Sequence, residues 1–178
     1  MSKDVLKEKV RNNAVVKSFI DLVSNRKDCH NLRLAGGAIV DILEGRTPKD
    51  YDFVGGSDLI ISYFKDNGYK FVSDTCTATT YRKDRIIVQF LKTDTYDFEF
   101  TISQASYNVK EDDFDIDLLA FNDKTLIPCN WYNKAKLFDG LRRVPHWYRK
   151  GYTIKDATYL SMLNATKPKH LDVVPFMS

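Results

Sequence analysis

The residues best suited to chemistry in this chain are two glycines, Gly36 and Gly37, and two aspartates, Asp50 and Asp52. On a strand the two aspartates would point to one face, with Cα atoms roughly 7 Å apart. A glycine pair before a helix lets backbone N–H groups approach an anion at the positive end of the helix dipole. Paired carboxylates beside such a turn are the groups that a magnesium-dependent phosphoryl transfer requires. The order of these residues therefore predicts a phosphoryl-transfer site.

The segments around these residues have the patterns of a strand, a turn, a helix and a second strand. The apolar run 32–35 indicates a buried strand, and 38–44 indicates about two turns of helix. In 50–53 the aspartates alternate with two aromatic residues, which is typical of a strand with one polar face. Asp41, in the first turns of the expected helix, would favour the dipole or cap N–H groups. We expect Asp41 to support the site rather than to bind a metal.

The same residues resemble a known family. Residues 36–41 and 45–53 are similar to the head-domain signature of tRNA nucleotidyltransferases (CCA-adding enzymes) and bacterial poly(A) polymerases, which belong to the DNA-polymerase-β-like nucleotidyltransferase superfamily. A second block, 113–122, resembles that family's Arg-Asp-Phe-Thr-Ile-Asn-Ala-Leu-Ala-Tyr stretch. The resemblance covers roughly residues 30–140. It implies an α+β nucleotidyltransferase fold, the polymerase-β-like palm, with a mixed β-sheet flanked by helices.

The resemblance also implies an activity. A nucleoside monophosphate would pass from a nucleoside triphosphate to an acceptor hydroxyl, with an RNA 3′ end such as that of tRNA as the expected acceptor and pyrophosphate as the product. Two Mg²⁺ or Mn²⁺ ions would be held by Asp50, Asp52 and a third carboxylate. The positions that match the family's nucleotide site are Gly36, Gly37, Asp41, Lys49 and Asp113. On a strand Lys49 would face away from the aspartates, which favours a structural or acceptor-binding role for it.

Four positions depart from the family pattern. Val40 and Asp112 stand where the family usually has arginines, and Asp115 and Asp117 replace its threonine and asparagine. Because the family uses the second block to contact the sugar and organise the nucleotide, the choice of nucleotide is not implied. Two alternatives stay open: transfer of the nucleotide to a protein or a small molecule, and a non-catalytic relative that binds nucleotide or RNA.

The third carboxylate has candidates in an expected strand over 96–102. Asp97 is the expected metal ligand and Glu99 the alternative, because the two share a face opposite three aromatic residues. A solvated polar face is the other interpretation of this pattern. Residues 113–117 also carry alternating aspartates and form a rival acidic row. A row of carboxylates repels itself, so at least one of the two rows should lie near cations.

Composition narrows the class of protein. The chain has 178 residues, 43% hydrophobic and 13% aromatic, which indicates a folded globular domain with a sizeable core. No apolar run approaches the roughly 20 residues of a membrane span. We expect no membrane association and a cytoplasmic location, the host cytoplasm for a virus-encoded chain. Three scattered cysteines favour a reducing compartment and argue against structural zinc.

The net charge of +3 is too small to indicate nucleic-acid binding by itself, but the distribution of the basic residues favours it. Basic residues interleaved with aromatics bind phosphates and stack on bases, although a solvated surface has the same composition. The candidate RNA-binding residues near the C-terminus are Arg142, Arg143, Arg149 and Lys150. We predict one catalytic domain over 1–178 with a basic helical extension over about 141–178. A protein partner that supplies acceptor recognition is a further expectation.

Periodicity predicts the remaining elements. They are an amphipathic helix from about 4 to 26, a helix over 58–66, strands over 69–73 and 85–92, a hairpin of 117–121 with 125–127, and a last helix over 154–165.

Overall fold

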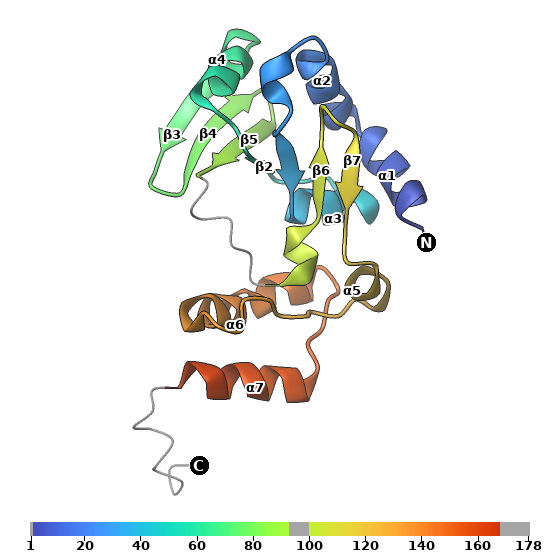
Figure 1. The fold of residues 1–178 in the computed structure, drawn as a ribbon, viewed down its shortest axis with the longest axis vertical. Coiled ribbons are helices and arrows are strands. Elements are labelled where there is room, and N and C mark those ends of the chain that lie inside the picture. The colour runs from blue at the N-terminus through green and yellow to red at the C-terminus, as the bar shows by residue number, and fades with distance from the viewer. Residues whose placement is uncertain (1, 93–99, 168–178) are drawn as a thin grey trace, which may run out of the picture. The chain divides into compact units, whose positions relative to one another are not determined.

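The computed structural model describes residues 2–92 and 100–167, which form two compact units. The first unit contains 2–92 and 103–118, and the second contains 100–102 and 119–167. In the described residues of the first unit, seven strands form one mixed sheet in the order β3-β4-β5-β2-β1-β6-β7 (Figure 1). The protein therefore has the α+β architecture, a mixed sheet with flanking helices, that the resemblance implied.

The strands are short, three to six residues each. They are β1 (Arg33–Ala35), β2 (Tyr51–Val54), β3 (Lys70–Asp74), β4 (Ala78–Lys83), β5 (Ile86–Leu91), β6 (Ser106–Asn108) and β7 (Asp113–Asp115). β2 pairs in parallel with β5 and antiparallel with β1, and the other neighbouring pairs are antiparallel. The central strand β2 thus carries the change from antiparallel to parallel pairing.

The described residues of the first unit form four α-helices and a short 3₁₀ helix. They are α1 (Lys3–Arg11), α2 (Ala14–Val23), η1 (Lys27–Cys29), α3 (Gly37–Leu43) and α4 (Asp58–Asp66). The remaining helices are η3 (Thr101–Gln104), α5 (Leu118–Asp123), α6 (Lys134–Arg149) and α7 (Asp156–Thr166), and α6 packs against α7. Among residues 2–92 and 100–167, no helix has both the length and the apolar composition to cross a membrane.

One face of the sheet packs on an aromatic core centred on Phe19 of α2. The centroid of the Phe19 ring lies 4.9 Å from that of Phe53 on β2 and 5.3 Å from that of Phe64 on α4, and both contacts are edge-to-face. Tyr51 and Tyr69 also pack against it. Helices α2 and α4 therefore cover the face that carries Tyr51 and Phe53. Because strand residues alternate, Asp52 points to the opposite face, which we call the site face.

The expected helix from 4 to 26 is wrong, because the chain forms two helices there. Helix α1 ends at Arg11, and α2 begins at Ala14. The side chain of Asn13 accepts hydrogen bonds from the N–H groups of Val15 and Val16, at 2.9 and 3.0 Å. An asparagine in this position starts a new helix more readily than it continues an old one, since its side chain competes for backbone donors.

Two other expected elements differ from the structure. Residues 118–123 form helix α5 where a hairpin strand was expected; the segment is too short for its apolar spacing to separate the two periods. In the expected strand 96–102, Thr101 and Ile102 belong to a 3₁₀ helix instead. Residues 96–99, with Asp97 and Glu99, lie outside the described residues.

We predict that Phe19→Ala lowers the free energy of unfolding by about 3–5 kcal/mol, because it removes the ring on which four other aromatic rings pack. Urea denaturation followed by circular dichroism measures this change. The matched control is Phe71→Ala on β3, where the side chain is 57% exposed, and its cost should stay below about 1 kcal/mol. Equal losses in the two variants would contradict the assignment of Phe19 to the centre of the core.

Candidate active site

The two aspartates of the predicted pair lie at the start of β2. Asp50 directly precedes the strand, and Asp52 is its second residue. Both are half-buried, whereas Tyr51 and Phe53 between and after them are buried. One carboxylate oxygen of Asp52, Oδ1, is inaccessible to solvent. The alternation puts the Asp52 carboxylate on the site face, and Asp50 precedes the strand by one residue.

The glycine turn lies at the same end of β2. Ala35, the last residue of β1, pairs with Asp52, and Gly36 follows it directly in the chain. Gly36 has φ +69° and ψ −127°, and its N–H donates to the carbonyl oxygen of Ala105 at 2.8 Å. A Cβ there would lie 3.2 Å from the carbonyl oxygen of Ser103. The positive φ angle and this close approach therefore explain why the position is occupied by a glycine.

Gly37 occupies a different position in the turn. It is the first residue of α3, and it is half-buried, whereas Gly36 is buried. The first N–H groups of a helix have no acceptor within the helix. The N–H groups of Gly37 and Ala38 are thus the donors that the turn can offer to a phosphate, while that of Gly36 is engaged by Ala105.

Asp41 holds the loop that leads from α3 to the aspartates. Its Oδ1 accepts a 3.1 Å hydrogen bond from Nε of Arg46, and its carbonyl oxygen accepts one of 2.8 Å from the Arg46 N–H. Nη1 of Arg46 also reaches Oε2 of Glu44 at 3.2 Å. Asp41 is buried, so this contact is fixed in place. Lys49, later in the loop, is exposed.

The carboxylate oxygens of Asp50 and Asp52 are of the kind that binds a hard divalent cation whose other ligands come from water and a substrate. Asp50 and Asp52 offer carboxylate oxygens two residues apart, and Mg²⁺ is commonly held by one or two carboxylates together with water and substrate phosphates. Within the described ranges, no group of three or more acidic, histidine or cysteine side chains could hold a metal by itself. Asp50 and Asp52 are therefore the residues that could hold such a cation, and that role stays a prediction.

The rival acidic row is neutralised by the protein's own cations. Asp115 pairs with Lys3 at 2.8 Å, and Arg33 lies 3.8 Å from Asp113. Asp112, in the β6–β7 turn, pairs with Lys7 at 3.0 Å and with Arg11 at 3.3 Å. The cations Lys3, Lys7 and Arg11 follow one another at spacings of four residues along α1, so they share one face of the helix.

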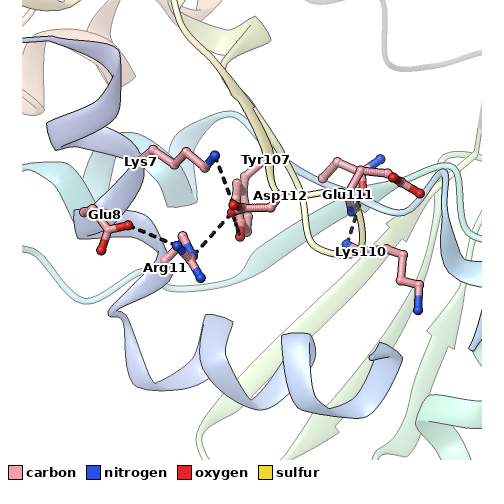
Figure 2. Close-up of polar contacts among 8 residues, drawn as sticks. Lys7, Glu8, Arg11, Tyr107, Lys110, Glu111 and Asp112 are labelled. Atoms are coloured by element: carbon pink, nitrogen blue, oxygen red, sulfur yellow. Dashed lines mark hydrogen bonds and ion pairs between the residues drawn. The ribbon is translucent and has the colours of Figure 1, made fainter. Parts of the chain in front are cut away.

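Figure 2 shows how the β6–β7 turn is attached to α1. The hydroxyl of Tyr107 donates a 2.7 Å hydrogen bond to Oδ1 of Asp112, which also receives Arg11. On the other side of the turn, Nζ of Lys110 reaches the carbonyl oxygens of Val23 and Ser24 at the end of α2. At this turn, where the resembling family has arginine, Asp112 thus makes structural contacts.

These contacts change the acidity of Asp112. Partial burial raises its pKa, but the hydrogen bonds from Tyr107 and Lys7 and the charge of Arg11 outweigh burial and hold the pKa below its ordinary value of 3.8. Burial and the hydrogen bond to Asp112 raise the pKa of Tyr107. The carboxylate form of Asp112 is therefore the form that fastens the turn to α1.

Two further positions of the resembling motifs can now be placed. Val40 is fully buried in α3, so a residue here packs in the core. Asp113 on β7 is exposed. In the register of the sheet it lies opposite Asn108 on β6, Asn108 lies opposite Arg33 on β1, and Arg33 lies opposite Val54 on β2, so β7 is the third strand from β2. With strands roughly 4.8 Å apart, Asp113 lies about 15 Å from the Asp52 strand. Its role in nucleotide binding stays a prediction.

The candidate RNA-binding residues divide between two sides of α6. Arg142 and Arg149 are exposed and share a stripe with Phe138, because they follow it by four and eleven residues. Arg143 is exposed on another side of the helix, and Nζ of Lys150 lies 5.6 Å from the Trp147 ring centroid. The buried face of α6 carries Leu137, Gly140, Val144 and Trp147.

Sequence reasoning missed two polar residues on the site face. Gln89 on β5 is the register partner of Asp52, and Thr80 on β4 is the register partner of Gln89. The signal available in the sequence was a single polar residue inside the otherwise apolar segment 86–91. Without the strand order, that signal does not say which residue lies beside it.

The fold and these positions can be compared with solved structures. A CCA-adding enzyme in complex with CTP aligns with 97% of this chain at a TM-score of 0.70 and 18% identity. The Thermotoga maritima CCA-adding enzyme in complex with tRNA aligns with 93% at 0.67 and 18% identity. The fold is that of the CCA-adding enzymes. A tRNA nucleotidyltransferase with a primer tRNA and an incoming ATP analogue also aligns, over 80% at 0.58 and 18% identity.

The likeness has clear bounds. The chain spans a little under half of each of these structures: 47%, 45% and 48% of the CTP complex, the Thermotoga maritima enzyme and the primer-tRNA complex. No protein-family model matches the sequence, and a search of curated proteins found no significant match. At 18% identity the comparison establishes the fold, and the activity has to be argued from the site.

We predict that Asp112→Asn lowers the free energy of unfolding by roughly 1 kcal/mol near pH 7, a small cost because the side chain is 42% exposed. Since the folded pKa lies below 3.8, the carboxylate stabilises the fold fully above about pH 5 and loses this effect as the pH falls through the folded pKa. Urea denaturation from pH 7 to pH 3 should therefore show the two proteins converging at low pH. The matched control is Glu111→Gln, the neighbouring exposed acid, which should leave the free energy of unfolding near pH 7 almost unchanged.

Proposed function

We propose that this protein is a metal-dependent nucleotidyltransferase that transfers a nucleoside monophosphate from a nucleoside triphosphate to the 3′ hydroxyl of a tRNA-like RNA. The observation that carries the proposal is the juxtaposition of Asp50 and Asp52 with the Gly36–Gly37 turn in a fold shared with CCA-adding enzymes. The aligned structures are described as complexes with CTP, ATP and tRNA, which supports the choice of nucleotide and acceptor classes.

Each part of the site has a role in this reaction. The N–H groups of Gly37 and Ala38 would bind phosphate oxygens at the N-terminus of α3. Asp50 and Asp52 would hold Mg²⁺ or Mn²⁺, which when bound neutralises charge on the triphosphate. Asp41 keeps the approach to Asp50 in position through Arg46. The acceptor oxygen forms a bond to the α-phosphorus as the bond to the bridging oxygen breaks, and pyrophosphate leaves.

One observation bears on the alternatives. Among the described residues Asp50 makes no ion pair, in contrast to the aspartates of the β6–β7 region, which are engaged by lysines and arginines. This contrast supports a cation-binding role and counts against a purely non-catalytic relative. Transfer to a protein or a small molecule uses the same site, so only the acceptor separates it from transfer to RNA.

The first test is incorporation of α-labelled ATP, CTP, GTP and UTP into total RNA with Mg²⁺ or Mn²⁺. We expect label in RNA of tRNA size, lost with a chelator and restored by either metal. Asp50→Asn and Asp52→Asn should each lower the rate about a thousandfold or more, because each removes a carboxylate that holds the metal, and a bound metal stabilises the transition state by several kcal/mol.

The matched control is Asp115→Asn, which removes a carboxylate of the rival row and should retain activity. Loss of activity in that variant, with Asp50→Asn active, would overturn the assignment of the metal site. Label in protein or small molecules, with none in RNA, would replace the proposed acceptor. Triphosphate binding without any transfer would establish the non-catalytic relative.

We further propose that the α6 stripe of Phe138, Arg142 and Arg149 contacts the RNA. Arg142→Ala with Arg149→Ala should weaken RNA binding about tenfold, and each lost phosphate contact should remove roughly 0.7–0.9 from the slope of log affinity against log salt. Filter binding with labelled tRNA measures both quantities. Lys9→Ala with Lys17→Ala, exposed cations of α1 and α2, removes the same charge and should change neither.

A further inference from the structure

Asp52 is flanked across the sheet by Ala35 on β1 and Gln89 on β5. Partners in register point to the same face, with Cα atoms roughly 5 Å apart. Neither flanking residue is a carboxylate. The amide of Gln89 is therefore the polar group that the neighbouring strands place beside Asp52.

The other site-face residues of β5 are aliphatic. Ile87 and Leu91 precede and follow Gln89 by two residues, so they point the same way, and all three are half-buried. An amide at such a position loses part of its hydration, which costs free energy unless polar partners replace the water. An aliphatic side chain would not incur this cost. Packing alone does not account for a glutamine between Ile87 and Leu91.

One partner of the amide lies on the side of β5 away from Asp52. Nε2 of Gln89 donates a 3.4 Å hydrogen bond to Oγ1 of Thr80 on β4. Thr80 is buried, so the hydroxyl offers a fixed acceptor. Strands β4 and β2 lie on opposite sides of β5. When the NH₂ group of Gln89 points toward Thr80 on β4, the amide oxygen is therefore the group that can point toward Asp52 on β2.

Resting on the proposed function, we propose that Gln89 is a supporting ligand of this site, whose amide oxygen, oriented by Thr80, acts as a neutral oxygen donor toward the divalent cation at Asp52. An amide adds an oxygen donor without adding negative charge. Compared with a carboxylate it attracts the cation less strongly, and it repels the triphosphate less.

The test measures Mn²⁺ binding by electron paramagnetic resonance in the presence of α,β-methylene-ATP, with thermal unfolding recorded for each protein. Gln89→Leu should weaken Mn²⁺ binding about tenfold, the loss expected when a supporting ligand group is removed. Gln89→Glu should tighten it about tenfold through the added charge. Thr80→Val should weaken it less than Gln89→Leu does. The matched control is Thr79→Val, whose hydroxyl lies on the opposite face of β4 and should not affect Mn²⁺.

Opposite effects of the leucine and glutamate variants support the proposal, since a packing role cannot change sign with charge. Unchanged Mn²⁺ binding in both variants, with the natural sequence binding Mn²⁺, overturns the role of Gln89 and leaves the proposed function standing. Weaker binding in both, in step with lower thermal stability, assigns Gln89 to packing and also overturns it. If the natural sequence and Asp52→Asn bind Mn²⁺ equally weakly, the cation site and with it the proposed function fail.

Discussion

The packing of Tyr51 and Phe53 against Phe19 determines which way the carboxylates of β2 point. Both rings are buried in the aromatic core beneath α2 and α4, and a strand has only two faces. A shift of one residue in the pairing of β2 would bring Asp52 into that core at a prohibitive desolvation cost. The register of the central strand, and with it the position of Gln89 and of the glycine turn, follows from this hydrophobic constraint.

Charge is distributed unequally between the two acidic regions of the first unit. The carboxylates of β7 and the β6–β7 turn are matched by lysines and arginines of α1 and β1, so they hold the N-terminal helix on the sheet. The carboxylates at β2 lie beside a glycine turn and an amide instead. The two regions look alike in the sequence, but the region of β7 and the β6–β7 turn serves the architecture, and the ligand-binding role of the β2 region is the one that we propose.

The sequence predicted the local secondary structure around the candidate residues well, because its signals are local. The alternation in 50–53, the glycines before α3 and the helix over 58–66 each depend on neighbouring residues. The break at Asn13 was missed because the apolar spacing continues across it, although the asparagine side chain provides the cap. Gln89 and the ion pairs of Asp112 could not be foreseen, since they depend on which strands and helices become neighbours. The role of Asp97 or Glu99 stays a prediction, as both lie outside the described residues.

The parallel pairing of β2 with β5 has a consequence for how the protein folds. Strand β1 and the turn after it are close in sequence to β2 and can pair with it early, but β5 reaches β2 only after α4, β3 and β4 have been made. Closing the long connection between β2 and β5 costs chain entropy, and the contacts between the two strands compensate for this cost only after the connection has closed. During synthesis the glycine turn and the carboxylate strand can therefore form before the amide arrives. On the proposed role of Gln89, we therefore expect the site to be completed only when β5 joins the sheet.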